Sequence, residues 1–219
     1  MLILASGSPR RRGLLSLLGV DFHVQTSETD ESVLIDESAQ DYVLRLAISK
    51  SLAFNPLSAE RLVVIAADTA VIDGEKILGK PGSQRQAIEM LDNLRNRTHQ
   101  VLSGIAVRDT KIDEIFTDMC TTQVEMRNYG EKEIEDYVAS GDPMDKAGAY
   151  AIQHLGFDPV AQITGCYANV VGLPLCHLGQ IFNRLGVEFR EEAIQGCLSN
   201  GEYQCRLVEK INAMDAGYN

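Results

Sequence analysis

The stretch Leu2-Ile3-Leu4-Ala5-Ser6-Gly7-Ser8-Pro9-Arg10-Arg11-Arg12-Gly13-Leu14-Leu15 decides how the chain begins to fold. A short apolar run ends in a Ser-Gly-Ser-Pro turn, and leucines at helical spacing follow. This order predicts a strand, a tight turn and a helix whose first position is Pro9. Amide groups at such a helix start bind anions, here beside Ser6 and Ser8, and the guanidinium groups of Arg10 and Arg11 suit phosphate oxygens. The other interpretation is an ordinary helix cap followed by solvated arginines.

The composition is that of an acidic globular protein, because the 219 residues carry a net charge of −11 and 45% of them are hydrophobic. This length suffices for one larger domain or two small lobes. The acidic balance argues against nucleic acid polymers and anionic membranes as partners. No apolar run reaches the roughly 20 residues of a membrane span, and no signal peptide is evident, so we expect a cytoplasmic protein.

The cysteines are odd in number and widely spaced, at positions Cys120, Cys166, Cys176, Cys197 and Cys205. None forms a C-x-x-C pair, so the sequence predicts neither a zinc knuckle nor a disulfide framework. We expect reduced, mostly structural thiols.

The segment 62–71 (LVVIAADTAV) is the most strand-like part of the chain. Its nearly unbroken apolar run predicts a central strand that is buried on both faces. Asp68 and Thr69 interrupt this run. A buried aspartate is costly unless it is paired, binds a metal or faces a cleft, so Asp68 is a candidate functional residue. The alternative is a surface bend, which the apolar flanks disfavour.

Two further groups of charged residues are candidates. The acidic turn at residues 27–32 contains Asp30 and Glu31, whose carboxylates either bind a hard divalent cation or belong to an ordinary solvated loop. Lys50 lies near the end of a predicted helix, where a lysine commonly just complements the helix dipole. Lys80 precedes a proline, so its backbone should be extended and its ammonium free to reach a ligand; the alternative is a plain exposed lysine.

The remaining periodicity predicts an α/β chain. We expect helices at residues 38–54, 83–94, 131–139 and about 175–185, and strands at residues 21–26, 98–107 and 112–127. Residues 144–153 combine small residues with polar ones such as Gln153, whose amide either reads a nucleobase edge or is merely polar. From residue 186 the pattern weakens, so we expect one domain, 1–185, and a partly mobile acidic extension, 186–219, of unknown role.

These cations and carboxylates suit a phosphate ester or anhydride with a divalent metal, although spacing alone does not bring them together. Their order also resembles that of the Maf family of nucleotide pyrophosphatases. The matching motifs are Ala5–Arg11 (ASGSPRR), Asp30-Glu31-Ser32, Arg45-Leu46-Ala47 with Lys50, Ala67-Asp68-Thr69, Gly79-Lys80-Pro81, Thr98-His99-Gln100-Val101, Asp145–Tyr150 (DKAGAY) and Val171-Gly172-Leu173-Pro174.

The resemblance implies an elongated, two-lobed α/β fold with a mixed sheet and a central cleft, like that of the inosine triphosphate pyrophosphatases. It implies a homodimer that hydrolyses a nucleoside triphosphate to the monophosphate and pyrophosphate with a divalent cation. The markers of the branch that resembles dTTP/UTP pyrophosphatases correspond to Arg10, Thr69 and Gln153, so we expect dTTP and UTP as substrates in nucleotide-pool house-cleaning. The alternatives are a 7-methyl-GTP pyrophosphatase and a nucleotide-binding regulator of septum formation.

The same resemblance suggests a role for each candidate residue. Asp68 would act as the general base on the attacking water. Glu31, with Asp30 and Asp68, would hold Mg²⁺ or Mn²⁺. Thr69 and Gln153 would read the pyrimidine. The triphosphate would be bound by Arg10, Arg11, Lys50 and Lys80 with the amides of the Ser6–Ser8 turn.

Overall fold

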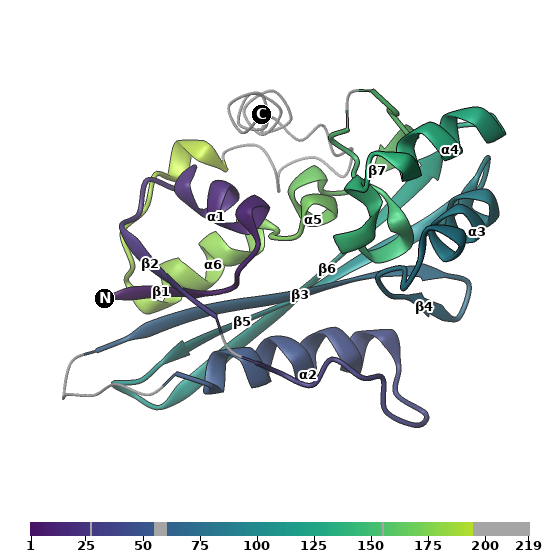
Figure 1. Cartoon of the computed structure of the whole chain (residues 1–219). Helices are drawn as coiled ribbons and strands as arrows, with labels where there is room; N and C mark the ends of the chain where they lie inside the picture. The colour runs from purple at the N-terminus through teal and green to yellow at the C-terminus, as the bar shows by residue number, and fades with distance from the viewer. Residues whose placement is uncertain (27, 55–60, 155, 195–219) are drawn as a thin grey trace.

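The computed structural model describes residues 1–26, 28–54, 61–154 and 156–194, and a mixed sheet of seven strands forms its centre (Figure 1). The strands are β1 (Leu2–Ala5), β2 (Phe22–Gln25), β3 (Val63–Asp73), β4 (Lys76–Leu78), β5 (Thr98–Asp109), β6 (Glu114–Met126) and β7 (Val160–Thr164). They lie in the order β2-β1-β3-β5-β6-β7, and β4 pairs with β3. β1 is parallel to β2 and β3, whereas the other pairs are antiparallel.

The predicted helices form, and serine side chains start three of them. The helices are α1 (Pro9–Ser16), α2 (Ala39–Leu52), α3 (Gln84–Leu94), α4 (Glu131–Ala139), α5 (Tyr167–Val171) and α6 (Leu175–Leu185), with the short 3₁₀ turns η1 (Asp142–Asp145), η2 (Ala147–Ala149) and η3 (Glu191–Ala193). Ser8, Ser38 and Ser83 each accept a hydrogen bond from the backbone N–H three residues later, which satisfies a donor that the helix start leaves open. None of the described helices is long and apolar enough to cross a bilayer.

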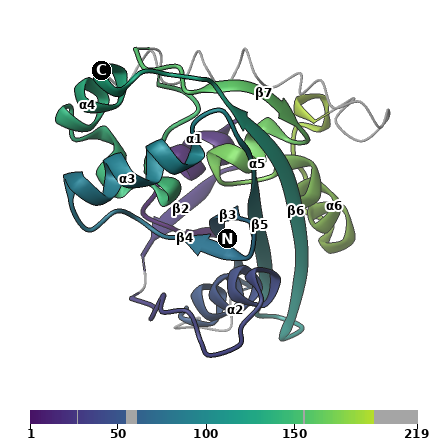
Figure 2. The same ribbon diagram turned by 90° about the vertical axis from the view of Figure 1, so that its right-hand side faces the viewer.

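Helices cover both faces of the sheet (Figures 1 and 2). On one of these faces the helices form two separate groups, one at each end of the sheet. Helix α2 lies along one face. On the other face, α1, α5 and α6 pack with β3 and β5 around one apolar cluster, whereas α3 and α4 pack with β5 and β6 around a second. The two ends are the lobes that the sequence predicts.

Strand β3 belongs to both lobes, and its apolar pattern breaks at the same point on each face. On the face of α1 and α6, Ala67 belongs to the first cluster and Val71 to the second, so Thr69 lies between them. On the face of α2, Asp68 lies between Ala66 and Ala70, which also belong to different clusters. Because side chains alternate between the two faces of a strand, the Asp68 carboxylate and the Thr69 hydroxyl lie on opposite faces of β3, each between two apolar clusters.

The first residues of the predicted extension pack against the body of the protein. The backbone N–H of Arg190 donates to the carbonyl of Leu18 at 2.7 Å, and the ring of Phe189 meets that of Phe182 with centroids 5.7 Å apart. Ala193 is buried in the first cluster. Residues 195–219 lie outside the described residues, so the division at residue 185 and the mobility of the extension stay predictions.

Gly104 of β5 is needed where α2 approaches the sheet. A Cβ at this position would lie 2.7 Å from the carbonyl oxygen of Val43 in α2. Because a packed helix backbone would have to move, we expect Gly104→Ala to lower the free energy of unfolding by about 1–3 kcal/mol, measured by urea denaturation. Gly79→Ala is the matched control, since nothing lies within 4 Å of its added Cβ. Equal losses in the two variants would contradict the close approach.

Candidate functional site

The site lies beside an unpaired stretch of strand edge. β1 pairs with Val63–Ile65 of β3, and β4 pairs with Val71–Asp73. Among the described strands, neither of these two neighbours pairs with residues 66–70 in between. A cavity of about 680 Å³ opens along this stretch. Its volume lies within the usual range for small-molecule sites, roughly 300–1,000 Å³.

The cavity brings together most residues that the sequence predicts for the site. Its lining includes Ser6, Ser8, Arg10, Arg11, Glu31, Lys50, Asp68, Thr69, Lys80 and Gln153. Asp30 is not among the described lining residues. Its exposed carboxylate accepts a hydrogen bond from the backbone N–H of Ser32 at 2.9 Å, which holds it in the turn. We therefore leave Asp30 out of the ligand set proposed below.

Lys50 of α2 joins two carboxylates at one side of the cavity. Its Nζ lies 2.6 Å from Oδ1 of Asp68 and 2.6 Å from Oε1 of Glu31. The side chains of Lys50 and Asp68 are only 12% and 10% exposed. An unpaired charge with so little solvent would be destabilising, so each of these two groups depends on the other.

Tyr42 completes this side of the cavity and supports Glu31. Its hydroxyl donates to the backbone carbonyl of Glu31 at 3.0 Å. Burial, with the charges of Asp68 and Glu31, raises the pKa of Tyr42 to about 12, so the hydroxyl keeps its proton. Burial would raise the pKa of Glu31, but the hydrogen bond from Lys50 and nearby cations outweigh this effect and lower it. Glu31 is therefore a carboxylate at neutral pH.

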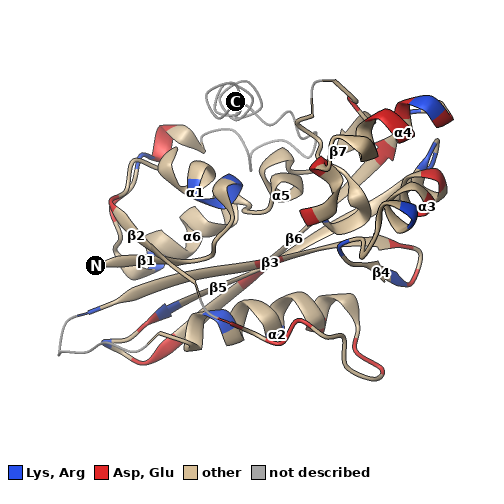
Figure 3. Cartoon of the chain, in the orientation of Figure 1, with Lys and Arg blue, Asp and Glu red and all other residues tan. Residues whose placement is uncertain are grey.

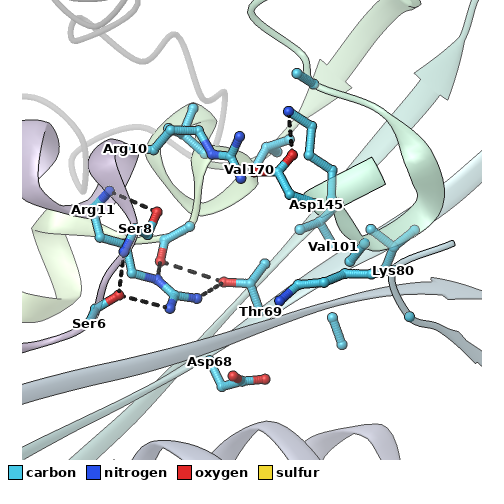
Figure 4. Close-up of a pocket in the computed structure, with 18 of the residues that line it drawn as sticks. Ser6, Ser8, Arg10, Arg11, Asp68, Thr69, Lys80, Val101, Asp145 and Val170 are labelled. Atoms are coloured by element: carbon cyan, nitrogen blue, oxygen red, sulfur yellow. Dashed lines mark hydrogen bonds and ion pairs between the residues drawn. The ribbon is translucent and has the colours of Figure 1, made fainter. Parts of the chain in front are cut away.

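Arg11 joins its own turn to two distant segments on the opposite face of β3 (Figure 4). Its Nε donates to the carbonyl of Gly172 at 2.9 Å, and its two terminal nitrogens donate to Thr69 Oγ1 at 3.1 Å and to Ser6 Oγ at 3.4 Å. Gly172 has a φ of 119°, which a side chain would strain, so the turn that presents this carbonyl requires glycine. The guanidinium is thus fixed in orientation before any ligand binds.

The hydroxyl of Thr69 belongs to the same network. It lies 2.7 Å from the hydroxyl of Ser103 on β5, and Ser103 is fully buried. Asp68 and Thr69, adjacent in sequence, therefore serve different sides of β3: Asp68 contacts α2, and Thr69 contacts α1.

Asp145 and Lys146 line the cavity on the side of the second lobe. The Nζ of Lys146 lies 2.6 Å from Oδ1 of Asp145, and Lys146 is buried. Burial opposes the shift, but the hydrogen bond from Lys146 and the charges of Lys146 and Arg10 lower the pKa of Asp145. Arg10 therefore acts electrostatically on Asp145 from the α1 side. Figure 4 shows Arg10 and Asp145 near one another at the upper part of the cavity.

The charges around the cavity differ from those of the whole protein. Its described lining carries five cations, Arg10, Arg11, Lys50, Lys80 and Lys146, and three carboxylates, Glu31, Asp68 and Asp145. Figure 3 shows the basic start of α1 on a chain whose net charge is −11. A cationic concavity of this kind attracts a compact, highly charged anion. Apolar side chains, among them Val101, Ile152 and Val170, complete the wall.

The donor set also fits a divalent cation. A carboxylate oxygen of Glu31 and one of Asp68 both contact the Lys50 ammonium, so the two carboxylates lie close together. Mg²⁺ is commonly bound by one or two carboxylates together with phosphate oxygens of a substrate. The described residues contain no group of three or more His, Cys, Asp or Glu side chains that could hold a metal ion.

Sequence reasoning missed two supporting residues, Tyr42 and Ser103. Tyr42 precedes Lys50 by eight residues, about two helical turns, and so lies on the same side of α2; this spacing is the signal that could have found it. Ser103 gave no local signal, and Gly172 belongs to the quoted Val171–Pro174 motif but received no role from it. Their contacts with Thr69 and Arg11 join residues 34 and 161 positions apart.

The fold and site are those of an α/β protein with a cationic cleft for a phosphate-bearing anion, and comparisons with known proteins identify the family. The Maf-like protein family matches residues 1–185. A "dTTP/UTP pyrophosphatase" of Desulforamulus reducens is 42% identical over 85% of this chain and 97% of that protein. Another, from Pasteurella multocida, is 44% identical over 84% of this chain and 96% of its own length. The chain belongs to the Maf-like protein family.

Solved structures also include similar proteins. A HAM1 protein from Coxiella burnetii is 17% identical, with a TM-score of 0.45, over 84% of this chain and 98% of that chain.

His99 is a buried residue that contacts the lining of the cavity, and its burial should make the free energy of unfolding depend on pH. Its Nε2 lies 2.8 Å from the hydroxyl of Tyr150, which lines the cavity, and burial lowers the pKa of His99 to about 4. In the unfolded chain the His99 ring takes up a proton near pH 6.5. The stability that the buried neutral ring contributes is therefore complete above that pH and is lost as pH falls towards 4. We expect this residue to lower the free energy of unfolding by about 2 kcal/mol between pH 7 and pH 5.

Urea denaturation at a series of pH values checks this expectation. Because carboxylates also titrate, the His99→Gln variant is the reference, and its stability should fall less steeply with acid than that of the wild type. Parallel curves for the two proteins would show that His99 is not the group responsible.

Proposed function

We propose that this protein is a nucleoside triphosphate pyrophosphatase that hydrolyses dTTP and UTP to the monophosphate and pyrophosphate. The observation that carries the proposal is Asp68, a nearly buried carboxylate paired with Lys50 at the wall of a cation-lined cavity. The relatives described as dTTP/UTP pyrophosphatases support the choice of nucleotide. Domain 1–185 would contain the whole site.

The cations around the cavity suit the triphosphate. Arg11 is held by its own hydrogen bonds, so it offers a fixed positive charge beside the α1 turn. Arg10, Lys50 and Lys80 would neutralise further phosphate oxygens, and the amides of the Ser6–Ser8 turn would add hydrogen bonds. Negative charge grows on the pyrophosphate leaving group during the reaction. Cations that are already in place stabilise this charge, because they need no costly reorganisation.

Asp68 is the proposed general base. Its neighbours fix the carboxylate, because Lys50 contacts Oδ1 and the strand on either side is buried. A fixed carboxylate is suited to take the proton of an attacking water. Glu31 and Asp68 would hold Mg²⁺ or Mn²⁺, which when bound would supply charge stabilisation to the phosphate oxygens.

Arg10, Thr69 and Gln153 are the proposed specificity residues. Gln153 has both an amide donor and an acceptor, as the edge of a pyrimidine requires. The Thr69 hydroxyl contacts Arg11, so it would affect the substrate at least in part by positioning that guanidinium. The apolar wall that includes Val101 and Val170 would pack against the base. A homodimer and a cytoplasmic location are further proposals. The homodimer rests on the family resemblance, and the location rests on the cysteine pattern, which predicts reduced thiols.

A substrate panel tests the function. Purified protein is assayed for pyrophosphate release from dTTP, UTP and 7-methyl-GTP with Mg²⁺ or Mn²⁺. We expect dTTP and UTP to be hydrolysed in preference to 7-methyl-GTP, and chelation of the metal to stop turnover. Preference for 7-methyl-GTP would contradict the proposed specificity, and tight nucleotide binding without pyrophosphate release would favour the septum-formation regulator.

The same assay includes a matched pair of variants on β3. Asp68→Asn keeps the shape of the side chain but removes the proposed base, so turnover should fall about 10²–10⁴-fold. Asp73→Asn is the control, because Asp73 lies on the same strand and also pairs with a cation, Arg97, at 2.7 Å. It should keep near-wild-type turnover. A folded Asp68→Asn protein with full activity would refute the assignment of the base.

A further inference from the structure

A second cluster of reactive groups lies outside the cavity, between β6 and α6. Asp118 and Cys120 lie two residues apart on β6 and so project from the same face of the strand. His177 comes from α6, which packs along β6 (Figure 2), and Cys166 precedes α5. None of these four is among the described residues that line the cavity.

The cluster activates the Cys120 thiol. Nδ1 of His177 lies 2.9 Å from Oδ2 of Asp118. Hydrogen bonds with Cys120 and Asp118 raise the pKa of His177 to about 9 against the effect of burial. A hydrogen bond from Cys166, opposed by burial and supported by His177, lowers the pKa of Cys120 to about 6. At neutral pH the pair is therefore an imidazolium beside a thiolate, the reactive form of cysteine.

The backbone holds Cys166 close to this thiolate. Thr122 lies two residues after Cys120 on the same face of β6, and its Oγ1 accepts a hydrogen bond from the N–H of Cys166 at 3.0 Å. The carbonyl of Cys166 lies 3.2 Å from the same hydroxyl oxygen. Cys166 is thus held beside β6 in the same apolar cluster as Cys120, and its thiol hydrogen-bonds to the Cys120 sulfur.

One side of the cluster is exposed to solvent. The side chains of His177 and Asp118 are 25% and 34% exposed, although Cys120 and Cys166 themselves are nearly buried. The cluster therefore meets solvent at the His177–Asp118 pair, beside the buried sulfur atoms. Both thiols are reduced in this structure.

We propose that Cys120 and Cys166 form an oxidisable dithiol that reacts with hydroperoxides. The Cys120 thiolate attacks one oxygen of hydrogen peroxide, the O–O bond breaks, and the departing hydroxide takes a proton from the His177 imidazolium to leave as water. This step leaves a sulfenic acid on Cys120. The Cys166 thiol then attacks that sulfur, a second water leaves, and a disulfide forms. Two thiols lose two electrons in all, and one peroxide becomes two waters.

The test uses the full-length chain with Cys197→Ser and Cys205→Ser, so that only Cys120, Cys166 and Cys176 remain. In the reduced protein at pH 7, iodoacetamide should alkylate Cys120 at least about tenfold faster than Cys176, which is also buried. After hydrogen peroxide treatment, peptide mass spectrometry should find a Cys120–Cys166 disulfide that dithiothreitol reverses.

Two variants separate the parts of the proposal. Cys166→Ser should leave the sulfenic acid on Cys120, where dimedone traps it, and His177→Gln should slow alkylation of Cys120 by about tenfold or more. Cys176→Ser is the matched control and should leave the disulfide unchanged. Equal alkylation of Cys120 and Cys176, or the absence of the linked peptide after oxidation, would overturn the proposal and leave the cluster as a packing contact between β6 and α6.

Discussion

Lys50 of α2 compensates the buried carboxylate of Asp68 in the middle of β3 and also contacts Glu31. A carboxylate in the middle of an apolar strand destabilises a fold by several kcal/mol unless a partner compensates it. Helix α2 supplies that partner, and its close approach to the sheet is possible because Gly104 has no side chain. The same helix therefore packs against β3 and positions the aspartate of that strand.

The division of the fold into two lobes follows from the same strand. β3 is long enough to enter both apolar clusters, and the break at Asp68 and Thr69 separates them on each face. Its edge lacks β1 and β4 over the same residues. One interruption in an apolar run therefore opens the cavity and supplies a carboxylate to one side of the strand. It also supplies a hydroxyl that anchors Arg11 on the other side.

Local features of the fold could be predicted from the sequence because their causes are local. Serine caps fixed the starts of α1, α2 and α3, and the interrupted strand singled out Asp68. Convergence of the site could not be predicted from spacing, because it depends on packing between distant segments. The role of Lys50 could not be decided from its position near a helix end. In the structure it is the partner of Asp68. Asp30 differs from Glu31 because a local turn holds its carboxylate, which neither composition nor motif reveals.

Lys50 and Asp68 are expected to act as one unit, and a double-mutant cycle measures their coupling. The measurement is kcat/KM for dTTP in the wild type, Lys50→Met, Asp68→Asn and the double variant. Because groups that act as a unit are strongly non-additive, we predict a loss in the double variant well below the product of the two single losses. A loss equal to that product would show that the two residues act independently and would contradict the account.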